Sequence, residues 1–371
     1  MSRALERSRG LSVLAWDHPR ATRPLAAASE AWAARTGRAF TIETRSLASF
    51  GDETPAQGGH DLVLIDHPHI GSAASNGAIL ELDGLLDESS LAERADDSIG
   101  PSHESYQWQG RQWALAVDAA CQVLACHPGL VAEGPVPETW EDVLALAAAQ
   151  PGRVALPLHP AHAISAFLSL VAARGVQVGT SQSVPRGIIE WAVEVLTKLA
   201  FNGPREAFNW EPPEVLEVLA RGDLACVPLV YGYVGYEASW RSAPRHGPDG
   251  RPGSILGGVG VAVLAGSTDP TAAARLADWL ASAHVQRTII GPSGGQPASR
   301  TAWSAADADP LLPAMRETIE ASQIRPRDPS WPAFQREAGE LLTAGLARGQ
   351  DPSDLASTLA RLLGRRHLAT Q

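Results

Sequence analysis

Two short clusters of histidine, aspartate and arginine are the residues of this sequence best suited to chemistry. Residues 17–20 read Asp-His-Pro-Arg and residues 66–69 read Asp-His-Pro-His. Such side chains can hold an anion or transfer protons, and a His-x-His pair with a third histidine can bind zinc. We expect a polar or anionic ligand here, with zinc as the sharper alternative. The structural alternative is that the histidines cap loops and bond the backbone. The ligand-binding candidates in these clusters are Asp17, His18, Arg20, Asp66, His67 and His69.

Each cluster follows a short apolar run that is typical of a buried strand, at residues 11–16 and 61–65. Between them, an alanine-rich helix predicted over 25–34 stops at Gly37, and residues 39–44 alternate like a second strand. This βαβ order predicts a parallel sheet, which binds ligands at the carboxyl ends of its strands. If Arg20 lies in an open cleft there, its replacement weakens an anion without affecting folding. Protonation of His18 or His67 would then tighten anion binding as the pH falls from about 7.5 to 6.

Further candidates follow other predicted strands. Trp16 could stack on a sugar ring or fill a core, and Asp118 could accept from ligand hydroxyls or cap a crossing between lobes. His159 follows a short strand at 154–156, and three of the four tyrosines lie within residues 231–236, directly after a strand at 224–230. Hydroxyl-bearing aromatics suit a binding pocket. The additional candidates are therefore Trp16, Asp118, His159, Tyr231, Tyr233, Gly257 and Gly258, the two glycines for close backbone approach or bending.

Catalytic motifs give little support for an enzyme. The sequence has no Gly-x-Ser-x-Gly elbow, no phosphate-binding Gly-x-x-x-x-Gly-Lys loop and no His-Glu-x-x-His pair. We therefore expect a binding protein without a cofactor or metal. A cytoplasmic enzyme or ligand sensor that uses the histidine clusters stays open as the alternative, because aspartate and histidine at strand ends suffice for proton transfer.

Composition limits the partners and the location. A chain of 371 residues with 44% hydrophobic and 19% charged residues has the length of two globular domains. No apolar run is long enough to insert into a membrane, and the net charge of −11 argues against nucleic acid as a partner. Three cysteines without a C-x-x-C pair fit a reducing compartment. Residues 1–10 lack a signal-peptide core, so we expect a cytoplasmic monomer, or an extracytoplasmic one if the gene starts upstream.

Several weak motifs, taken in order, resemble the extracellular solute-binding proteins of ABC importers, in the branch that binds maltodextrins and other sugars. The matching segments are residues 61–86, 106–118, 137–146, 219–225, 257–260, 279–286 and 294–297. The resemblance implies reversible binding of a carbohydrate-like or hydroxy-acid solute, with an ABC permease as a possible partner. The histidine clusters depart from the more neutral loops that are common in the sugar binders.

The resemblance also implies an α/β fold of the type 2 periplasmic-binding-protein class. Each of two lobes would hold a mixed, mostly parallel sheet flanked by helices, with a hinged cleft between the lobes. Lobe 1 would comprise residues 10–116 and 256–304, and lobe 2 residues 119–250 and 308–371. The chain would cross between the lobes near residues 116–119, 250–256 and 304–308.

Overall fold

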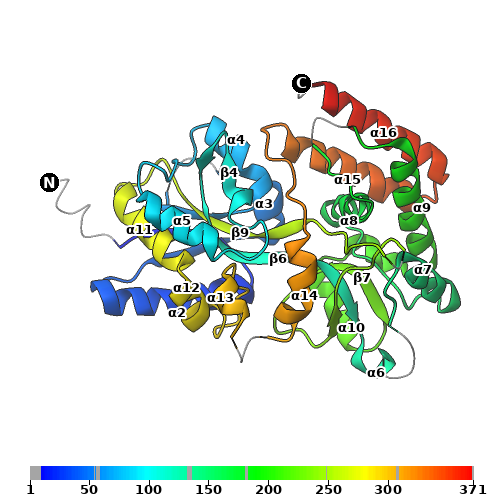
Figure 1. Ribbon diagram of the computed structural model, residues 1–371, viewed down its shortest axis with the longest axis horizontal. Helices are drawn as coiled ribbons and strands as arrows, with labels where there is room; N and C mark the ends of the chain where they lie inside the picture. The colour runs from blue at the N-terminus through cyan, green and yellow to red at the C-terminus, as the bar shows by residue number, and fades with distance from the viewer. Residues whose placement is uncertain are drawn as a thin grey trace. The chain divides into compact units, whose positions relative to one another are not determined.

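The chain divides into two compact units in the computed structural model (Figure 1). The structure describes residues 10–53, 55, 59–131, 136–179, 183–247, 249–305 and 309–369. Unit 1 comprises Met1–Ala119, Gly257–Asp309 and Arg327–Pro332, and unit 2 comprises Ala120–Leu256, Pro310–Pro326 and Ala333–Gln371. Residues 327–332, expected in the second lobe, thus belong to unit 1. Part of the third expected crossing, residues 306–308, lies outside the described residues, and the hinge role of the crossings stays a prediction.

The sheet of unit 1 is mixed, as predicted. Its strand order is β2-β1-β3-β9-β6, where β1 pairs in parallel with β2 and β3, and β9 runs antiparallel to β3. The bounds of these strands are β1 Ser12–Trp16, β2 Thr41–Arg45, β3 Leu62–Ile65, β6 Leu115–Cys126 and β9 Leu256–Val263. The predicted βαβ unit is therefore confirmed, and the carboxyl ends of β1 and β3 lie at the same edge of the sheet.

Both faces of the central strand β3 are buried, because its alternate residues enter different hydrophobic clusters. Leu62 and Leu64 of β3 pack with helices α2 and α11, whereas Val63 and Ile65 pack with helix α4 and Tyr106. Figure 1 shows α2 and α11 beside the strands. The other elements of unit 1 are α2 Pro19–Thr36, α3 Leu47–Asp52, η1 His67–His69, α4 Ile70–Ser75, α5 Glu88–Asp96, η2 Glu104–Tyr106, β4 Gln107–Trp108, β5 Arg111–Gln112, α11 Pro270–Ala281, α12 Ala283–Val285, η4 Gln286–Ile290 and α13 Arg300–Trp303.

Helix α2 begins earlier than the pattern predicts, at Pro19 rather than Leu25. The fixed φ angle of proline suits the first helical position, and the His18 side chain caps the helix by accepting from the Arg20 N–H. Arg20 consequently lies in a helix rather than in the expected loop. The predicted glycine cap is confirmed, since Gly37 ends the helix with φ 80°.

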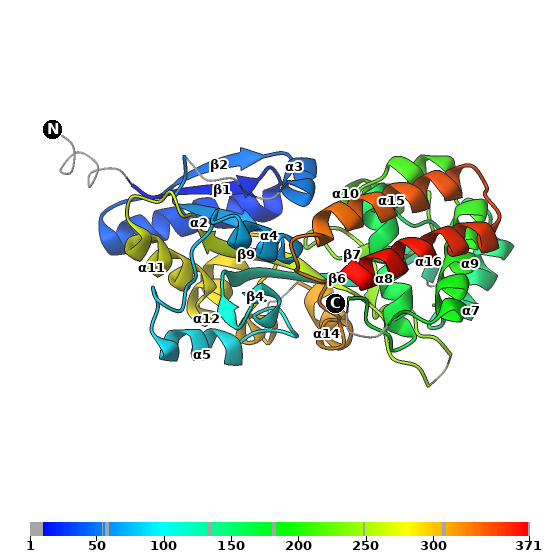
Figure 2. The ribbon, with the colours of Figure 1, turned by 90° about the horizontal axis from the view of Figure 1, so that it is seen from above.

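Unit 2 is built around the second half of β6. Strands β7 and β8 both pair antiparallel to β6, so the described ladders of this unit differ from the mostly parallel sheet that we expected. Helix α8 is buried along most of its length, and α9 packs on α8 and α16 (Figure 2). The elements are α6 Pro128–Val131, α7 Trp140–Ala149, α8 Pro160–Ala173, α9 Arg186–Asn202, η3 Arg205–Asn209, α10 Pro212–Ala220, β7 Cys226–Tyr231, β8 Ser239–Arg241, α14 Leu311–Glu320, α15 Trp331–Ala347 and α16 Pro352–Ala369.

Strand β6 is continuous across Asp118, which lies at the first of the expected crossings between the lobes. A charged residue normally interrupts a buried strand because its desolvation is costly. Here the Asp118 carboxylate binds the Arg20 guanidinium, which compensates the cost and lets the strand continue. Among the described residues, no helix combines the length and the apolar character that a membrane span requires.

Candidate functional site

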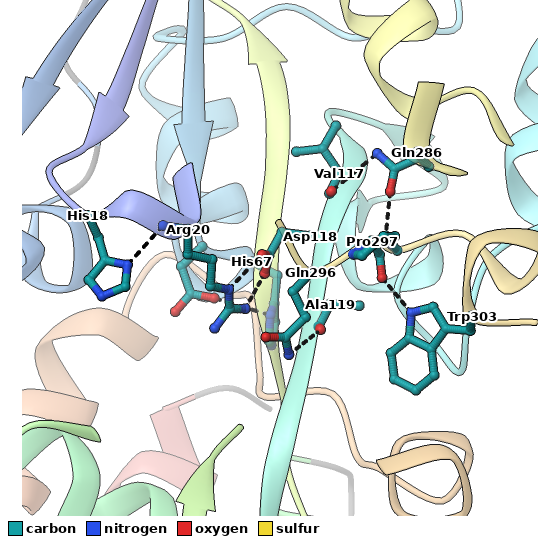
Figure 3. Close-up of polar contacts among 12 residues, drawn as sticks. His18, Arg20, His67, Val117, Asp118, Ala119, Gln286, Gln296, Pro297 and Trp303 are labelled. Carbon is teal, nitrogen blue, oxygen red and sulfur yellow. Dashed lines mark hydrogen bonds and ion pairs between the residues drawn. The ribbon is translucent and has the colours of Figure 1, made fainter. Parts of the chain in front are cut away.

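The two histidine clusters lie at the same edge of the unit 1 sheet. Figure 3 shows His18, Arg20, His67 and Asp118 close together. This placement follows from the parallel pairing of β1 with β3, which brings their carboxyl ends side by side. Strand β6 adds Asp118 to the group. The sequence-based grouping of the clusters is therefore reproduced, but Arg20, His67 and His69 are buried.

Arg20 and Asp118 form a buried bidentate ion pair. Arg20 Nε donates to Asp118 Oδ2 over 2.7 Å, and Arg20 Nη2 donates to Asp118 Oδ1. The two side chains are only 5% and 7% exposed. Burial raises the pKa of Asp118, and the charge and hydrogen bonds of Arg20 oppose that rise. The Arg20 guanidinium thus binds a carboxylate inside the protein. The expectation that Arg20 lies in an open cleft is wrong.

His18 performs a structural task at the start of α2. Its Nδ1 accepts the Arg20 N–H over 3.1 Å, and its ring is half-buried. Burial, and then the positive charges of Arg20 and Arg23, lower the pKa of His18. His18 therefore protonates at a lower pH than a free imidazole, so it is a poor source of the tighter anion binding expected between about pH 7.5 and 6.

His67 and His69 are both buried in η1, at 0% and 2% exposure. His67 packs edge-on against Tyr106, and its Nδ1 lies 3.3 Å from Asp66 Oδ1. His69 Nε2 lies 2.9 Å from the Gly51 carbonyl oxygen, within hydrogen-bond distance. Within the described ranges, no three histidine, cysteine or acidic side chains form a group that could hold a metal ion, so the zinc alternative has no support there.

Trp16 fills the core beside these clusters. It is 4% exposed and packs on Phe50 with ring centroids 5.2 Å apart. A small cavity of about 30 Å³ adjoins Trp16, Arg20, Asp118 and Gln296. A cavity of this volume holds about one water molecule. Of the cluster residues, Asp17 is exposed and Asp66 and His18 are partly exposed, so the two carboxylates are accessible from solvent at this edge.

Gln296, which sequence reasoning missed as a site residue, holds a loop on strand β6. Its side-chain Nε2 donates to the Ala119 carbonyl over 2.9 Å, and its main-chain carbonyl accepts the Ala119 N–H over 3.0 Å. Gln286 binds the same strand two residues earlier, where its side-chain Nε2 donates to the Val117 carbonyl (Figure 3). The available sequence signal was the Gly-Gly-Gln-Pro segment at 294–297, which contains Gln296. In the structure Gln286 and Gln296 are both fully buried, where an amide needs defined partners.

Gly257 and Gly258 lie at the start of β9, and Gly258 allows close backbone approach, as the sequence predicts. Gly258 has φ +113°, and a Cβ atom there would lie 2.3 Å from the Asp118 carbonyl oxygen. The absence of a side chain therefore lets β9 lie against β6 at the position of Asp118.

Unit 2 holds a second polar group, which we call the histidine–glutamate group: His159, His162, Glu211 and Tyr231. His162 Nε2 lies 2.5 Å from Glu211 Oε2, and His159 Nδ1 lies 3.2 Å from Glu211 Oε1. The Tyr231 ring packs edge-on against His162 at 6.2 Å between centroids. The side chains of His159 and Glu211 are 38% and 27% exposed, so this group is accessible from solvent.

Glu211 joins the candidate residues only through the structure. Burial opposes its ionisation, but the hydrogen bond from His162 and the charges of His162 and His159 outweigh burial and lower the pKa of Glu211. Glu211 precedes helix α10, and its N–H donates to Glu214 Oε2 over 2.7 Å. An acidic residue before Pro212 indicates a helix start, but nothing local in the sequence indicates that two histidines 49 and 52 positions earlier meet it.

The remaining predicted tyrosine, Tyr233, is buried. It is 7% exposed and packs edge-on against Tyr236, with ring centroids 6.2 Å apart. Tyr231, which ends β7, is partly exposed. The structure therefore separates the tyrosine segment into one residue beside the histidine–glutamate group and one residue in the core.

Comparison with protein families identifies a family model described as bacterial extracellular solute-binding protein, which matches residues 50–314. A search of curated proteins finds no match. The chain is similar to several solved structures. An ABC transporter solute-binding protein from Agrobacterium radiobacter K84, in complex with ribitol, is 20% identical, with 97% of this chain and 99% of that chain covered and a TM-score of 0.80.

Two further solved structures share the fold. A solute-binding protein from Thermotoga lettingae bound with α-D-tagatose is 15% identical, covers 96% of this chain and 100% of its own, and has a TM-score of 0.76. The maltose-bound MalE3 protein of T. maritima is 15% identical, covers 96% and 99%, and has a TM-score of 0.80. These likenesses agree with the two-lobed α/β architecture of periplasmic binding proteins.

Proposed function

The chain belongs to the bacterial extracellular solute-binding proteins, and we propose that it binds a neutral polyhydroxylated solute, a sugar or polyol, for delivery to an ABC permease. Solute binding follows from the family, whereas the chemical class of the ligand rests on the candidate residues. We also propose that the protein acts as a monomer and outside the cytoplasm, the second of the two locations that the sequence left open. Light scattering on the purified chain tests the monomer.

The histidine–glutamate group carries the proposal. Its ionised Glu211 carboxylate accepts hydrogen bonds, while the imidazoles of His159 and His162 and the Tyr231 hydroxyl can donate or accept them. Sugar hydroxyls are both donors and acceptors, so a mixed set of this kind matches them. Tyr231 also offers an aromatic ring, which suits the apolar face of a pyranose. A carboxylate at the centre of the group repels an anionic solute, which favours a neutral one.

The residues of unit 1 support the same ligand class. Arg20 is the cation of the sequence clusters, and its charge is already balanced by Asp118. The accessible side chains at this edge include the carboxylates of Asp17 and Asp66. Carboxylates accept from hydroxyls and disfavour organic acids. We therefore rank the hydroxy-acid reading of the sequence below the carbohydrate reading.

The solved structures that share the fold offer independent support, since the three contain bound ribitol, tagatose and maltose. All three ligands are neutral and polyhydroxylated. Their size range, from one polyol to a disaccharide, leaves the length of the solute to experiment.

Calorimetric titration tests the ligand class. The purified chain is titrated with pentitols, hexoses, maltose and hydroxy acids, and Glu211→Gln is titrated with the ligand that binds best. We expect a sugar or polyol to bind and Glu211→Gln to weaken it by roughly 10- to 150-fold, the equivalent of about 1.5 to 3 kcal/mol for a hydrogen bond to a charged group.

A matched control is Glu194→Gln, which removes an exposed carboxylate that pairs with Lys198 on the surface of α9. This variant should bind as the wild type does. Preference for a hydroxy acid, or equal binding by wild type and Glu211→Gln, contradicts the proposal. Conversion of the bound sugar into a product supports the enzyme alternative instead.

A further inference from the structure

Two of the three cysteines lie directly opposite each other on neighbouring strands of unit 2. Cys126 is the last residue of β6, Cys226 is the first residue of β7, and the two are register partners in this antiparallel pair. All three cysteines are free thiols and buried. Although 100 residues separate Cys126 and Cys226 in sequence, the fold places them together.

The backbone hydrogen bonds identify Cys126 and Cys226 as a non-hydrogen-bonded pair. The Cys226 N–H donates to the Arg153 carbonyl and the Cys226 carbonyl accepts from Ala155, so both groups point away from β6. The adjacent bond, from the His127 N–H to the Ala225 carbonyl, lies at the next register position. In such pairs the Cα atoms lie about 4.5 Å apart and the side chains are closer than in hydrogen-bonded pairs.

The two thiols also share one face of the sheet. Directly opposite residues of an antiparallel pair point to the same side, and both cysteines belong to one hydrophobic cluster with Leu124. A disulfide needs Cα atoms about 4.4 to 6.8 Å apart, so a non-hydrogen-bonded pair satisfies the requirement without moving the strands.

We propose that Cys126 and Cys226 are joined by a disulfide bond when the chain folds in an oxidising compartment. The oxidant is a disulfide compound such as oxidised glutathione. The thiolate of one cysteine attacks it, releases one reduced glutathione and forms a mixed disulfide. The thiolate of the second cysteine then displaces the other glutathione. Two protein thiols thus become one disulfide, and the oxidant takes up two electrons and two protons.

The reaction belongs to folding rather than to the folded protein. Contact with the Cys226 thiol and burial raise the pKa of Cys126 far above its usual range, so the reactive thiolate is scarce once β6 and β7 have paired. Both side chains are also shielded from a bulky oxidant, at 0% and 4% exposure. The bond should therefore form while the strands assemble, and the folded reduced protein should resist oxidation.

Cys121 is the internal control. It lies on β6, an odd number of positions before Cys126, and side chains alternate between the faces of a strand. Its thiol contacts the hydroxyls of Ser254 and Ser322 rather than another cysteine. We expect Cys121 to stay reduced.

Refolding tests the proposal. The full chain is refolded from denaturant in a buffer of oxidised and reduced glutathione, denatured again under acid quench, alkylated and analysed by mass spectrometry. We expect one tryptic product that joins residues 112–153 to residues 222–241. Fragmentation of this product should place the single alkylated thiol at Cys121 and the disulfide at Cys126. Three alkylated thiols, or a disulfide that includes Cys121, overturn the proposal.

Cysteine variants and melting temperatures distinguish the disulfide from general effects on folding. Cys121→Ser should retain the disulfide, whereas Cys226→Ser should retain two alkylatable thiols. Oxidised wild type should melt roughly 5 to 15 °C above the same protein reduced with dithiothreitol, because the bond closes a loop of about 100 residues. Equal melting temperatures of oxidised and reduced wild type also count against the bond. Sugar binding by the reduced protein is a separate readout, so failure of the disulfide leaves the proposed function untouched.

Discussion

Arg20, in the first turn of helix α2, and Asp118, in strand β6, form a bidentate ion pair although 98 positions separate them in the sequence. The pair ties a helix that follows β1 to a strand at the other side of β3 and β9. Because both side chains are buried, each charge depends on the other for its solvation. The pair is therefore part of the architecture of unit 1.

Removal of either partner should destabilise the protein. We expect Arg20→Ala and Asp118→Asn each to lower the free energy of unfolding by about 3 to 5 kcal/mol, because each leaves one buried group without its counter-charge. Urea denaturation followed by circular dichroism measures the change. An Arg20→Ala protein as stable as the wild type would instead restore the open-cleft reading of Arg20.

The double variant Arg20→Met, Asp118→Leu separates the lost attraction from the charge that is left behind. Replacement of both partners by apolar residues of similar volume is often nearly neutral. We expect this double variant to be more stable than the matching single variants Arg20→Met and Asp118→Leu. If the effects of the single variants simply add, the two residues do not act as a pair.

Gly258→Ala should be among the most damaging glycine substitutions in unit 1. The new Cβ would lie 2.3 Å from the Asp118 carbonyl oxygen and 2.8 Å from the Ala119 Cα, both backbone atoms that cannot rotate away. We expect a loss of at least about 2 to 3 kcal/mol in the free energy of unfolding, as for other overpacked sites. Gly37→Ala is the matched control, because Gly37 has φ +80° but no atom within 4 Å of its Cβ position. That control should lose only about 1 kcal/mol, from backbone strain. Similar losses in the two variants would show that the contact with β6 is unimportant.

Acid should lower the free energy of unfolding through the protonation of His103. Burial lowers the pKa of His103 from 6.5 to about 4. Between pH 6.5 and 4 the unfolded chain binds a proton at this histidine, whereas the folded protein does not. The free energy of unfolding is therefore highest above pH 6.5 and decreases as the pH falls towards 4. The loss reaches about 3 kcal/mol at pH 4. Urea denaturation at a series of pH values between 4 and 7 measures it.

His103→Gln should flatten this part of the pH profile, whatever its effect on stability at neutral pH. His284→Gln, at an exposed position, serves as the control and should keep the wild-type slope. A wild-type slope in the His103→Gln protein would place the acid sensitivity on other groups.

Local sequence patterns predicted the strands and helix caps that depend only on residues close together in the chain. The strands at β1 and β3 follow from short apolar runs, and the cap at Gly37 follows from a glycine after an alanine-rich helix. Thr139 and Asp142, three positions apart, likewise form a capping box at the start of α7. Helix α2 shows where such patterns fail, since the cap by His18 and the position of Pro19 extended it towards Arg20.

The sequence by itself determined the family, the two-lobed α/β class and the convergence of the residues after β1 and β3, because motif order, hydrophobic period and the direction of parallel strands are all encoded along the chain. Only the tertiary structure decided which side chains from distant segments meet. The pairing of Arg20 with Asp118, the contact of Glu211 with His159 and His162, and the register of Cys126 against Cys226 each join distant segments. Such contacts depend on strand order, strand register and the packing of whole helices. No local period or spacing specifies those features, since many pairings bury the same apolar residues equally well and only the assembled core selects one.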